Sequence, residues 1–320
     1  MNKRVVVFDM NNLFIRHYIV NPALAINGNP IGGYKGSISS LQYLFREMKP
    51  DEVVVVWDGA GGSQKRKSIN KNYKEGRKPI RLNRSVKNMT EDQELKNQVW
   101  QQVRLMEMLN FMPVIQLVSD GIEADDVISY VVQNNKYDGW QKIIISSDKD
   151  FFQLCDDETV LYRPIQKKYV NKPRILKDFD IHPTNFAMAR AIVGDQSDNL
   201  KGVKGVGLKT VAKKMPFFSL PDSVTVDDVI EFCENDNTNL KTISSIKESR
   251  DLIAENYKIM QLYSPAISFQ TKSKLKYALE NFEAEFNKTE VIKRMSEDGF
   301  GEWNTSDLFA TFKKISNNRG

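Results

Sequence analysis

The sequence has very few of the residues from which many enzyme sites are built. Only two cysteines, Cys155 and Cys233, and two histidines, His17 and His182, occur among its 320 residues. Two cysteines are too few for a disulfide framework or a cysteine metal site. Two histidines are almost too few for a histidine zinc site and make a Ser-His-Asp triad improbable. We expect two buried, unreactive thiols, and we expect His182, which precedes Pro183, to lie at a helix start.

Long apolar runs are missing as well. No stretch approaches the roughly 20 residues that a membrane helix needs, and the first residues lead into a strand pattern without a signal-peptide core. The apolar share of 41% and the charged share of 27% are typical of a globular protein. We therefore expect a monomeric cytoplasmic protein with no membrane partner.

Positive charge is concentrated in one segment, residues 60–98, which we call the basic arm. The net charge of the chain is only +5, yet ten basic residues lie in this arm between residues 65 and 87, against Glu75 alone. Such a segment can be a solvated loop, but it is also suited to release counterions from nucleic acid, with Tyr34 and Tyr73 as stacking surfaces. The ten are Lys65, Arg66, Lys67, Lys71, Lys74, Arg77, Lys78, Arg81, Arg84 and Lys87.

Three apolar runs each stop at a carboxylate. Short β-branched runs of this kind are typical of strands in a parallel sheet that is covered on both faces. Ligand sites in such sheets form outside the carboxyl ends of the strands, so Asp9, Asp58 and Asp148 should share one rim. The runs are residues 5–9, 53–58 and 143–148.

Helical patterns alternate with these runs and predict a doubly wound α/β fold. They lie at about 36–48, 91–110 and 124–134, and a helical chain follows Pro164. In the second helix we expect one apolar stripe to pack into the core. The stripe consists of Leu95, Val99, Val103, Met106 and Leu109.

Two further acidic clusters accompany the three strand ends. Each cluster alone has a simpler explanation, as a helix cap or as a turn after a strand. Together, so many carboxylates could not remain ionised without cations, because each raises the pKa of the next. Hard divalent ions such as Mg²⁺ prefer oxygen ligands, and two of them suit phosphodiester hydrolysis. The clusters and their neighbours contribute Glu123, Asp125, Asp126, Asp150, Asp195 and Asp198.

A glycine-rich segment at residues 202–210, expected to form a hairpin, nearly matches the sequence motif of a nucleotide-binding P-loop. Leu208 interrupts the required Gly-Lys-Thr and no strand precedes the hairpin, which excludes ATP binding of that type. The hairpin is either an ordinary interhelical turn or a phosphate-binding turn that presents backbone N–H groups. Its polar members are Lys201, Lys204, Lys209 and Thr210, with Gly202, Gly205 and Gly207.

The combination of four motifs, in this order, resembles the 5′-nuclease family. That family includes the 5′ to 3′ exonuclease domain of bacterial DNA polymerase I, phage 5′ exonucleases and flap endonucleases. The resemblance implies a PIN-like, mostly parallel sheet with a helical arch and a helix-hairpin-helix. The last 60 residues are less typical of the family, and their length and helical pattern resemble the stand-alone phage enzymes more than a polymerase fusion. The motifs are residues 73–79, 121–127, 147–150 and 194–199.

The resemblance also assigns residue roles. Asp9, Asp58, Glu123, Asp125 and Asp148 would serve a first Mg²⁺, and Asp148, Asp150, Asp195 and Asp198 a second, with Asp126 at a further acidic position. Mn²⁺ could substitute. Lys74 and Arg77 would contact the scissile phosphate, with Arg16, Arg66 and Tyr73 as further DNA contacts. Residues 185–215 would grip duplex DNA and hold K⁺ through main-chain carbonyls.

The expected activity is therefore a two-metal 5′ to 3′ exonuclease or 5′-flap endonuclease that leaves 5′-phosphates and removes RNA primers or flaps during replication. Expected partners are DNA with a 5′ flap, a nick or an RNA-primed duplex, and replication proteins such as a single-strand binding protein or a clamp. We expect a nuclease core at 1–180, a duplex-binding region at 181–262 and a helical extension at 263–320. The alternatives are a non-catalytic junction-binding protein and a PIN-type single-strand ribonuclease.

Overall fold

A computed structural model describes residues 3–77, 80–83, 85–86, 89–238 and 240–317. Its centre is a six-stranded sheet in the order β3-β2-β1-β4-β5-β6. All neighbouring strands are parallel except β6, which pairs antiparallel with β5. The strands are β1 (Arg4–Asp9), β2 (Glu52–Trp57), β3 (Ile115–Val118), β4 (Gln141–Ile145), β5 (Thr159–Arg163) and β6 (Lys168–Val170).

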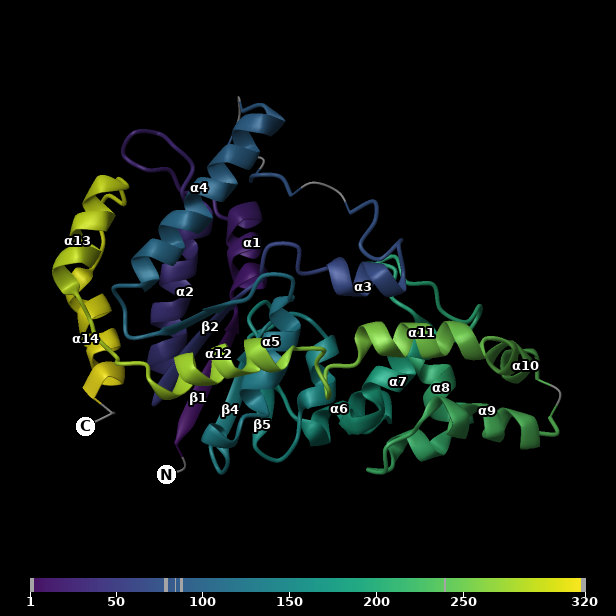
Figure 1. Ribbon diagram of the computed structural model, residues 1–320. Coiled ribbons are helices and arrows are strands. Elements are labelled where there is room, and N and C mark those ends of the chain that lie inside the picture. The colour runs from purple at the N-terminus through teal and green to yellow at the C-terminus, as the bar shows by residue number, and fades with distance from the viewer. Residues whose placement is uncertain (1–2, 78–79, 84, 87–88, 239, 318–320) are drawn as a thin grey trace.

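Helices cover both faces of this sheet (Figure 1). The α-helices of the first half are α1 (Met10–Val20), α2 (Gly32–Met48), α3 (Gln64–Ile69), α4 (Glu91–Leu109) and α5 (Ala124–Val132). Those of the second half are α6 (Lys172–Phe179), α7 (Pro183–Val193), α8 (Leu208–Lys214), α9 (Val226–Asn235), α10 (Lys241–Glu248), α11 (Arg250–Met260), α12 (Phe269–Glu280), α13 (Lys288–Glu297) and α14 (Thr305–Asn317). Short 3₁₀ helices are η1 (Asn135–Tyr137), η2 (Asp150–Leu154) and η3 (Pro216–Ser219).

The β-branched strands separate two hydrophobic cores, because successive side chains of a strand point to opposite faces. Val5 and Val7 of β1 pack with α5 and α7 in one core. Val6 and Phe8 pack with α1, α2 and the C-terminal helices in the other. Strands β1, β2 and β4 are therefore buried on both sides, as their uninterrupted apolar runs predict. The carboxyl ends of the five parallel strands form one edge of the sheet.

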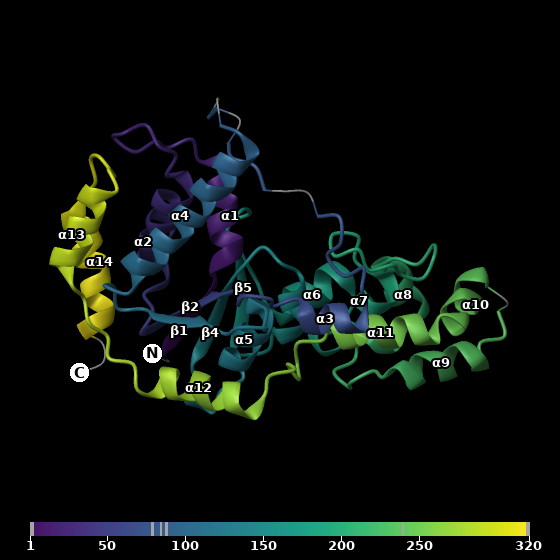
Figure 2. The same cartoon turned by 45° about the horizontal axis from the view of Figure 1, so that its top comes forward.

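The helical second half extends away from the sheet at one end, and the C-terminal helices occupy the other. Figures 1 and 2 show α8 to α10 far from the sheet and α13 and α14 beside α2. Helix α12 crosses the α5 side of the sheet between these ends, and the backbone carbonyl of its Lys272 accepts a hydrogen bond from Tyr130 Oη (3.1 Å). No helix within the described ranges is both long and apolar enough to cross a membrane.

The fold confirms the doubly wound prediction but adds elements that the sequence reading missed. Helix α1 begins directly after β1, where no helix was expected, although Met10, Leu13, Phe14 and Tyr18 are buried at helical spacing. Strands β5 and β6 were also missed. His182 does lie at a helix start, as the N-cap of α7. The two cysteines are buried and unpaired.

The predicted core stripe of α4 is confirmed for Met106 and Leu109 but is wrong for its first three residues. Leu95, Val99 and Val103 are 59%, 52% and 45% exposed. The buried face instead carries Leu105 and Leu109, together with Met108 and the amide of Gln101. The helix turns this polar residue inward because Gln101 Oε1 accepts a hydrogen bond from the backbone N–H of Tyr34 (3.0 Å) at the start of α2. Hydrophobic periodicity alone could not choose between two competing apolar faces.

Candidate active site: an acidic rim beneath the basic arm

The carboxyl end of β1 supplies Asp9, which begins the rim. Asp9 is the N-cap of α1, and its Oδ1 accepts a hydrogen bond from the backbone N–H of Asn12 (3.1 Å). Its Oδ2 accepts from Ser146 Oγ (2.8 Å), which follows β4. Asn12 Oδ1 in turn accepts from the backbone N–H of Ser147 (3.2 Å). These contacts hold the ends of β1 and β4 together.

The carboxyl end of β2 supplies Asp58, which joins the rim to α5. Asp58 Oδ1 accepts from the backbone N–H of Ala124 (2.8 Å) and therefore satisfies one of the free donors at the start of α5. Its Oδ2 accepts from Asn11 Nδ2 (2.6 Å). Asp125 and Asp126 lie in the first turn of α5. The structure thus brings Asp58 and the Glu123–Asp126 cluster to one place.

Asp148 and Asp150 follow β4 in a tight turn that leads into η2. Asp148 Oδ1 accepts from the backbone N–H of Asp150 (2.8 Å), and the backbone N–H of Asp148 donates to Ser146 Oγ (3.1 Å). Arg190 of α7 bridges Asp150 (Nε to Oδ1, 3.1 Å) and Asp195. The second acidic cluster is therefore tied to the strand ends through one arginine.

The rim carboxylates influence one another electrostatically. Burial, followed by repulsion from Asp58 and Asp148, raises the pKa of Asp9 to about 7. Burial and the charge of Asp148 likewise raise the pKa of Asp150 to about 7. The pKa of Asp125 lies well above its ordinary value for the same two reasons. The rim by itself thus carries more negative charge than it can keep ionised at neutral pH.

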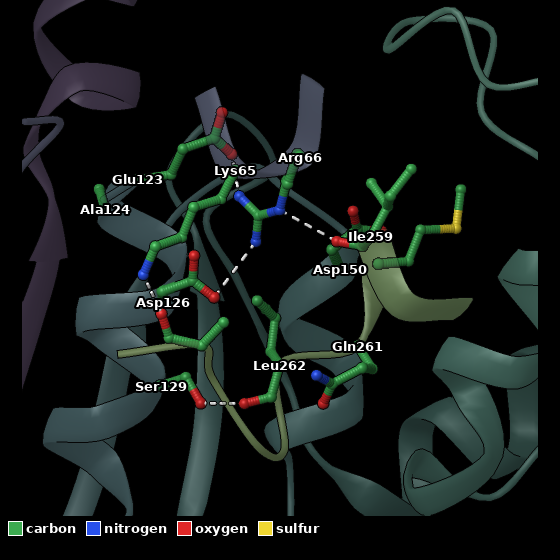
Figure 3. Close-up of polar contacts among 12 residues, drawn as sticks. Lys65, Arg66, Glu123, Ala124, Asp126, Ser129, Asp150, Ile259, Gln261 and Leu262 are labelled. Atoms are coloured by element: carbon green, nitrogen blue, oxygen red, sulfur yellow. Dashed lines mark hydrogen bonds and ion pairs between the residues drawn. The ribbon is translucent and has the colours of Figure 1, made fainter. Parts of the chain in front are cut away.

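The basic arm is anchored on this rim through Glu123. Burial opposes ionisation of Glu123, but Arg66 and Lys74 outweigh it, so its pKa lies below the ordinary value. Lys74 Nζ donates to Glu123 Oε1 (2.7 Å), and Tyr73 Oη donates to Oε2 (3.0 Å). Figure 3 shows the Arg66 guanidinium directed at Glu123, at Asp126 (3.4 Å) and at the carbonyl oxygen of Ile259 on α11.

A second contact fixes the foot of the arm to the turn at residues 195–199. Arg77 forms an ion pair with Asp198, and the backbone N–H of Lys74 donates to the Asp198 carbonyl (2.9 Å). Asn199 Nδ2 donates to the carbonyl of Asn72 (2.9 Å). Lys74 and Asn199 both have left-handed backbone conformations, with φ of 57°, which turn the two loops toward each other. The arm therefore closes over the acidic side chains.

The sequence of this part of the chain matches a known family. Residues 4–180 match the model of the 5′-3′ exonuclease, N-terminal resolvase-like domain. The chain belongs to this 5′-3′ exonuclease family. A 5′-3′ exonuclease of Aquifex aeolicus is 26% identical over 267 residues, which cover 82% of this chain and 82% of that protein. A DNA polymerase I of Caldicellulosiruptor bescii is 30% identical over 68% of this chain but only 24% of its own length.

Solved structures of phage enzymes have the same fold. The bacteriophage T5 D15 flap endonuclease, in a complex with DNA and metal ions, matches with a TM-score of 0.67 and 17% identity, over 97% of this chain and 100% of that chain. The T5 5′-exonuclease with bound zinc ions also gives 0.67, at 18% identity, over 92% and 98%. The match extends through the helical second half, beyond the part that the family model covers.

The rim residues fit divalent cations in kind. Their donors are carboxylate oxygens, which Mg²⁺ and Mn²⁺ prefer, and the raised pKa values of Asp9, Asp125 and Asp150 mark a place where positive charge is lacking. Within the described residues, however, no three such side chains already form a group able to hold an ion. Several of them are instead turned toward the cations of the arm and toward Arg190.

The predicted DNA contacts fall into three groups. Arg66 and Tyr73 are buried, so they hold the arm in place, and either one can reach a nucleic acid only if the arm moves. Arg16 is half-buried on α1. The exposed lysines surround the hairpin between α7 and α8: Lys201, Lys204 and Lys209. Lys78, Arg84 and Lys87 lie outside the described residues, and the expectation that Tyr34 stacks on bases is wrong because its ring is buried against Phe300.

The hairpin is built for close backbone contact. Gly202 lies against Val193, where an added Cβ would come within 1.8 Å of the carbonyl oxygen. Asn256 of α11 donates to the carbonyls of Ala191 (2.9 Å) and Lys201 (2.8 Å) and so ties the hairpin to its neighbouring helix. Gly207 is the N-cap of α8.

Sequence reasoning missed four polar residues that organise the rim. Asn11, Asn12 and Ser146 orient Asp58 and Asp9, and Arg190 joins Asp150 to the second acidic cluster. Asn11 and Asn12, two and three residues after Asp9, were a usable signal, since such residues favour helix starts. Arg190 lies 40 residues from Asp150 in sequence and gave no signal.

Proposed function

We propose that this chain is a structure-specific 5′-nuclease that cuts DNA carrying a 5′ flap, a nick or an RNA-primed end. Water oxygen attacks the phosphorus, the bond from phosphorus to the 3′ oxygen breaks, and the products carry a 5′-phosphate and a 3′-hydroxyl. The single observation that carries this proposal is the acidic rim at the carboxyl ends of three strands with a basic arm docked on it. Family membership and the T5 structures support it.

In this proposal the rim holds two Mg²⁺ ions. The first set of ligands comprises Asp9, Asp58, Glu123, Asp125 and Asp148, and the second comprises Asp148, Asp150, Asp195 and Asp198, with Asp126 nearby. Divalent ions bound there would lower the pKa of water and stabilise charge on the phosphate oxygens. Mn²⁺ would substitute, because it accepts the same oxygen donors.

The arm supplies cations to the reacting phosphate. Lys74 and Arg77 now neutralise Glu123 and Asp198. If Glu123 and Asp198 held metal ions instead, Lys74 and Arg77 would be available to a scissile phosphate bound beside the rim. The same two residues thus exchange an internal ion pair for a substrate contact, which requires only side-chain movement.

The hairpin supplies the grip on duplex DNA in this proposal. Its lysines face solvent while its glycines bring backbone N–H groups to the surface, an arrangement suited to phosphate. Carbonyl groups of the same loop would accommodate K⁺. The nuclease core then spans 1–180, the duplex-binding region 181–262 and the extension 263–320.

The test is cleavage of a labelled 5′-flap DNA by the full chain in Mg²⁺, in Mn²⁺ and in chelator. Asp148→Asn should abolish cleavage while leaving DNA binding in chelator measurable. Asp251→Asn is the matched control, because Asp251 is exposed on α11, away from the rim. Cleavage by Asp148→Asn at the wild-type rate would refute the site.

A non-catalytic junction-binding protein is the second candidate. The observation that favours it is the absence, within the described residues, of a ready-made metal group. It predicts tight flap binding that is unaffected by Mg²⁺ and no cleavage under any condition. The same assay therefore separates the two candidates.

The biological role that follows from the proposal is removal of RNA primers or displaced flaps at replication forks. The chain would act as a monomer in the cytoplasm of a bacterium or of a phage-infected host. A single-strand binding protein or a clamp would be its replication partner.

A further inference from the structure

A hollow on the surface lies outside the rim, and none of the proposed catalytic residues lines it. Its volume is about 600 Å³, which is within the range of small-ligand sites. It lies between α1, α2, the turn from β5 to β6, and the loop before α14. Core and C-terminal extension thus build it together.

One wall of the hollow begins at the edge of the sheet where the rim lies. Tyr162, in its wall, is paired in register with Ile145 of β4, only three residues before Asp148. Arg163, the next residue, donates from Nη2 to the carbonyl of Ser147 (3.1 Å). Neighbouring strands are about 5 Å apart, so the wall begins one strand away from the rim. The hollow is therefore within reach of a polymer that crosses the rim.

The hollow and the arm lie on opposite sides of the rim. The arm docks at Glu123 and Asp198, on the α5 and α7 side of the sheet. The hollow is bounded by α1 and α2, which cover the other face. The rim therefore lies between the docking points of the arm and the hollow.

The charges in the hollow favour an anion at one end. Asp307 is neutralised by Arg46 (2.7 Å), and it also accepts from Gln42. Arg16 and Lys167 have no carboxylate partner among the described residues. The other acidic residue that lines the hollow is Glu302, which is exposed. His17, held by Ser40 (2.6 Å), has a pKa lowered to about 4 by burial and by Arg16, and therefore adds no charge.

The hollow also offers an aromatic surface. Tyr43 of α2 is 40% exposed, and Lys167 Nζ lies over one face of its ring, 5.9 Å from the ring centre. Trp303 of the extension lines the opposite part of the hollow. An exposed ring next to cations that have no carboxylate partner suits single-stranded nucleic acid, with the base on the free face of the ring and the phosphate on the cations.

We propose that this hollow is a second nucleic-acid subsite, which takes an unpaired nucleotide with its base on Tyr43 and its phosphate on Lys167 and Arg16. It rests on the proposed function, because the strand it receives is the one that has crossed the rim. It also assigns a role to the C-terminal extension, whose Trp303 closes the subsite.

The test is the affinity of the full chain for a labelled single-stranded oligonucleotide of about 12 nucleotides and for a blunt duplex of the same length, in chelator. Tyr43→Ala should weaken single-strand binding about tenfold and leave duplex binding unchanged. Tyr43→Phe should retain wild-type affinity, because the ring remains. Tyr277→Ala removes an exposed tyrosine of α12 and should have no effect.

Lys167→Ala should weaken single-strand binding a few-fold and reduce the slope of log affinity against log salt by about 0.7. The proposal is overturned if Tyr43→Ala binds the single strand within twofold of wild type, or if both DNAs lose affinity equally. Flap cleavage in Mg²⁺, measured in parallel, keeps the two proposals apart. If the chain cuts flaps but Tyr43→Ala leaves single-strand binding unchanged, the nuclease function stands and the subsite is refuted. If the chain does not cut flaps but Tyr43→Ala weakens single-strand binding, the subsite stands and the nuclease function is refuted.

Discussion

Glu123→Gln tests how the basic arm is held, because this substitution keeps the shape of the side chain and removes its charge. Glu123 is 3% exposed and contacts Arg66, Lys74 and Tyr73. In the variant, the buried Arg66 keeps only the more distant Asp126 (3.4 Å) as a carboxylate partner. A buried charge that loses its nearest partner is strongly destabilising.

The expected cost is about 3 kcal/mol, the lower end of the range for breaking a buried ion pair. At about 2 °C per kcal/mol for a chain of this size, the melting temperature should fall by about 6 °C. The pKa of Glu123 lies below its ordinary value, so its contribution is present above that ordinary value and is lost as the pH falls through the lowered one. The difference between variant and wild type should therefore shrink in acid.

Thermal unfolding followed by circular dichroism in chelator is the appropriate assay, since it excludes any effect of metal. Limited trypsin digestion provides a second readout, because an arm released from Glu123 should be cut faster at its lysines and arginines. Arg81, which pairs with Glu91 and Glu94, gives the control: Glu91→Gln removes an exposed partner and should leave the melting temperature nearly unchanged. A Glu123→Gln variant that melts within 1 °C of wild type, with unchanged digestion, would refute the anchoring role.

Three further predictions follow from the site. Burial and neighbouring carboxylates raise the pKa of Asp9 and of Asp150 to about 7, so the stability that their protonated forms support is present in acid and lost as the pH rises through about 7. The gain in melting temperature on adding Mg²⁺ should therefore be larger near pH 8 than near pH 5.5. An equal gain at both pH values would contradict this. Lys204→Ala should weaken duplex binding and lower its salt slope by about one, measured by anisotropy across a salt series. Gly202→Ala should disrupt the hairpin, because its Cβ would meet Val193, and should lower both the melting temperature and duplex affinity; a fully stable variant would show that the hairpin can shift.

The strands and the position of the rim could be predicted from the sequence because both depend on local patterns. Val and Ile runs that end in Asp specify buried parallel strands, and parallel strands place their carboxyl ends on one edge. Asp9, Asp58 and Asp148 accordingly lie where the sequence suggested. The doubly wound order of the sheet follows from the same alternation.

The contacts of the arm could not be predicted, because they join residues far apart in sequence. Lys74 and Glu123 are 49 residues apart, and Arg77 and Asp198 are 121 apart. The sequence around Lys74 and Arg77 does not specify which carboxylate each of them contacts. The orientation of α4 could not be predicted for a related reason. Its buried face includes Gln101, whose side chain accepts a hydrogen bond from α2, and this long-range contact outweighs the burial of the apolar stripe.

The most direct test of the central claim is a crystal structure of the full chain grown with Mn²⁺, in which anomalous scattering locates the metal. The account predicts Mn²⁺ beside Asp9, Asp148 and Asp150, with Lys74 and Arg77 released from Glu123 and Asp198. A structure with Mn²⁺ bound only elsewhere, or with the rim carboxylates still paired to the arm, would contradict it.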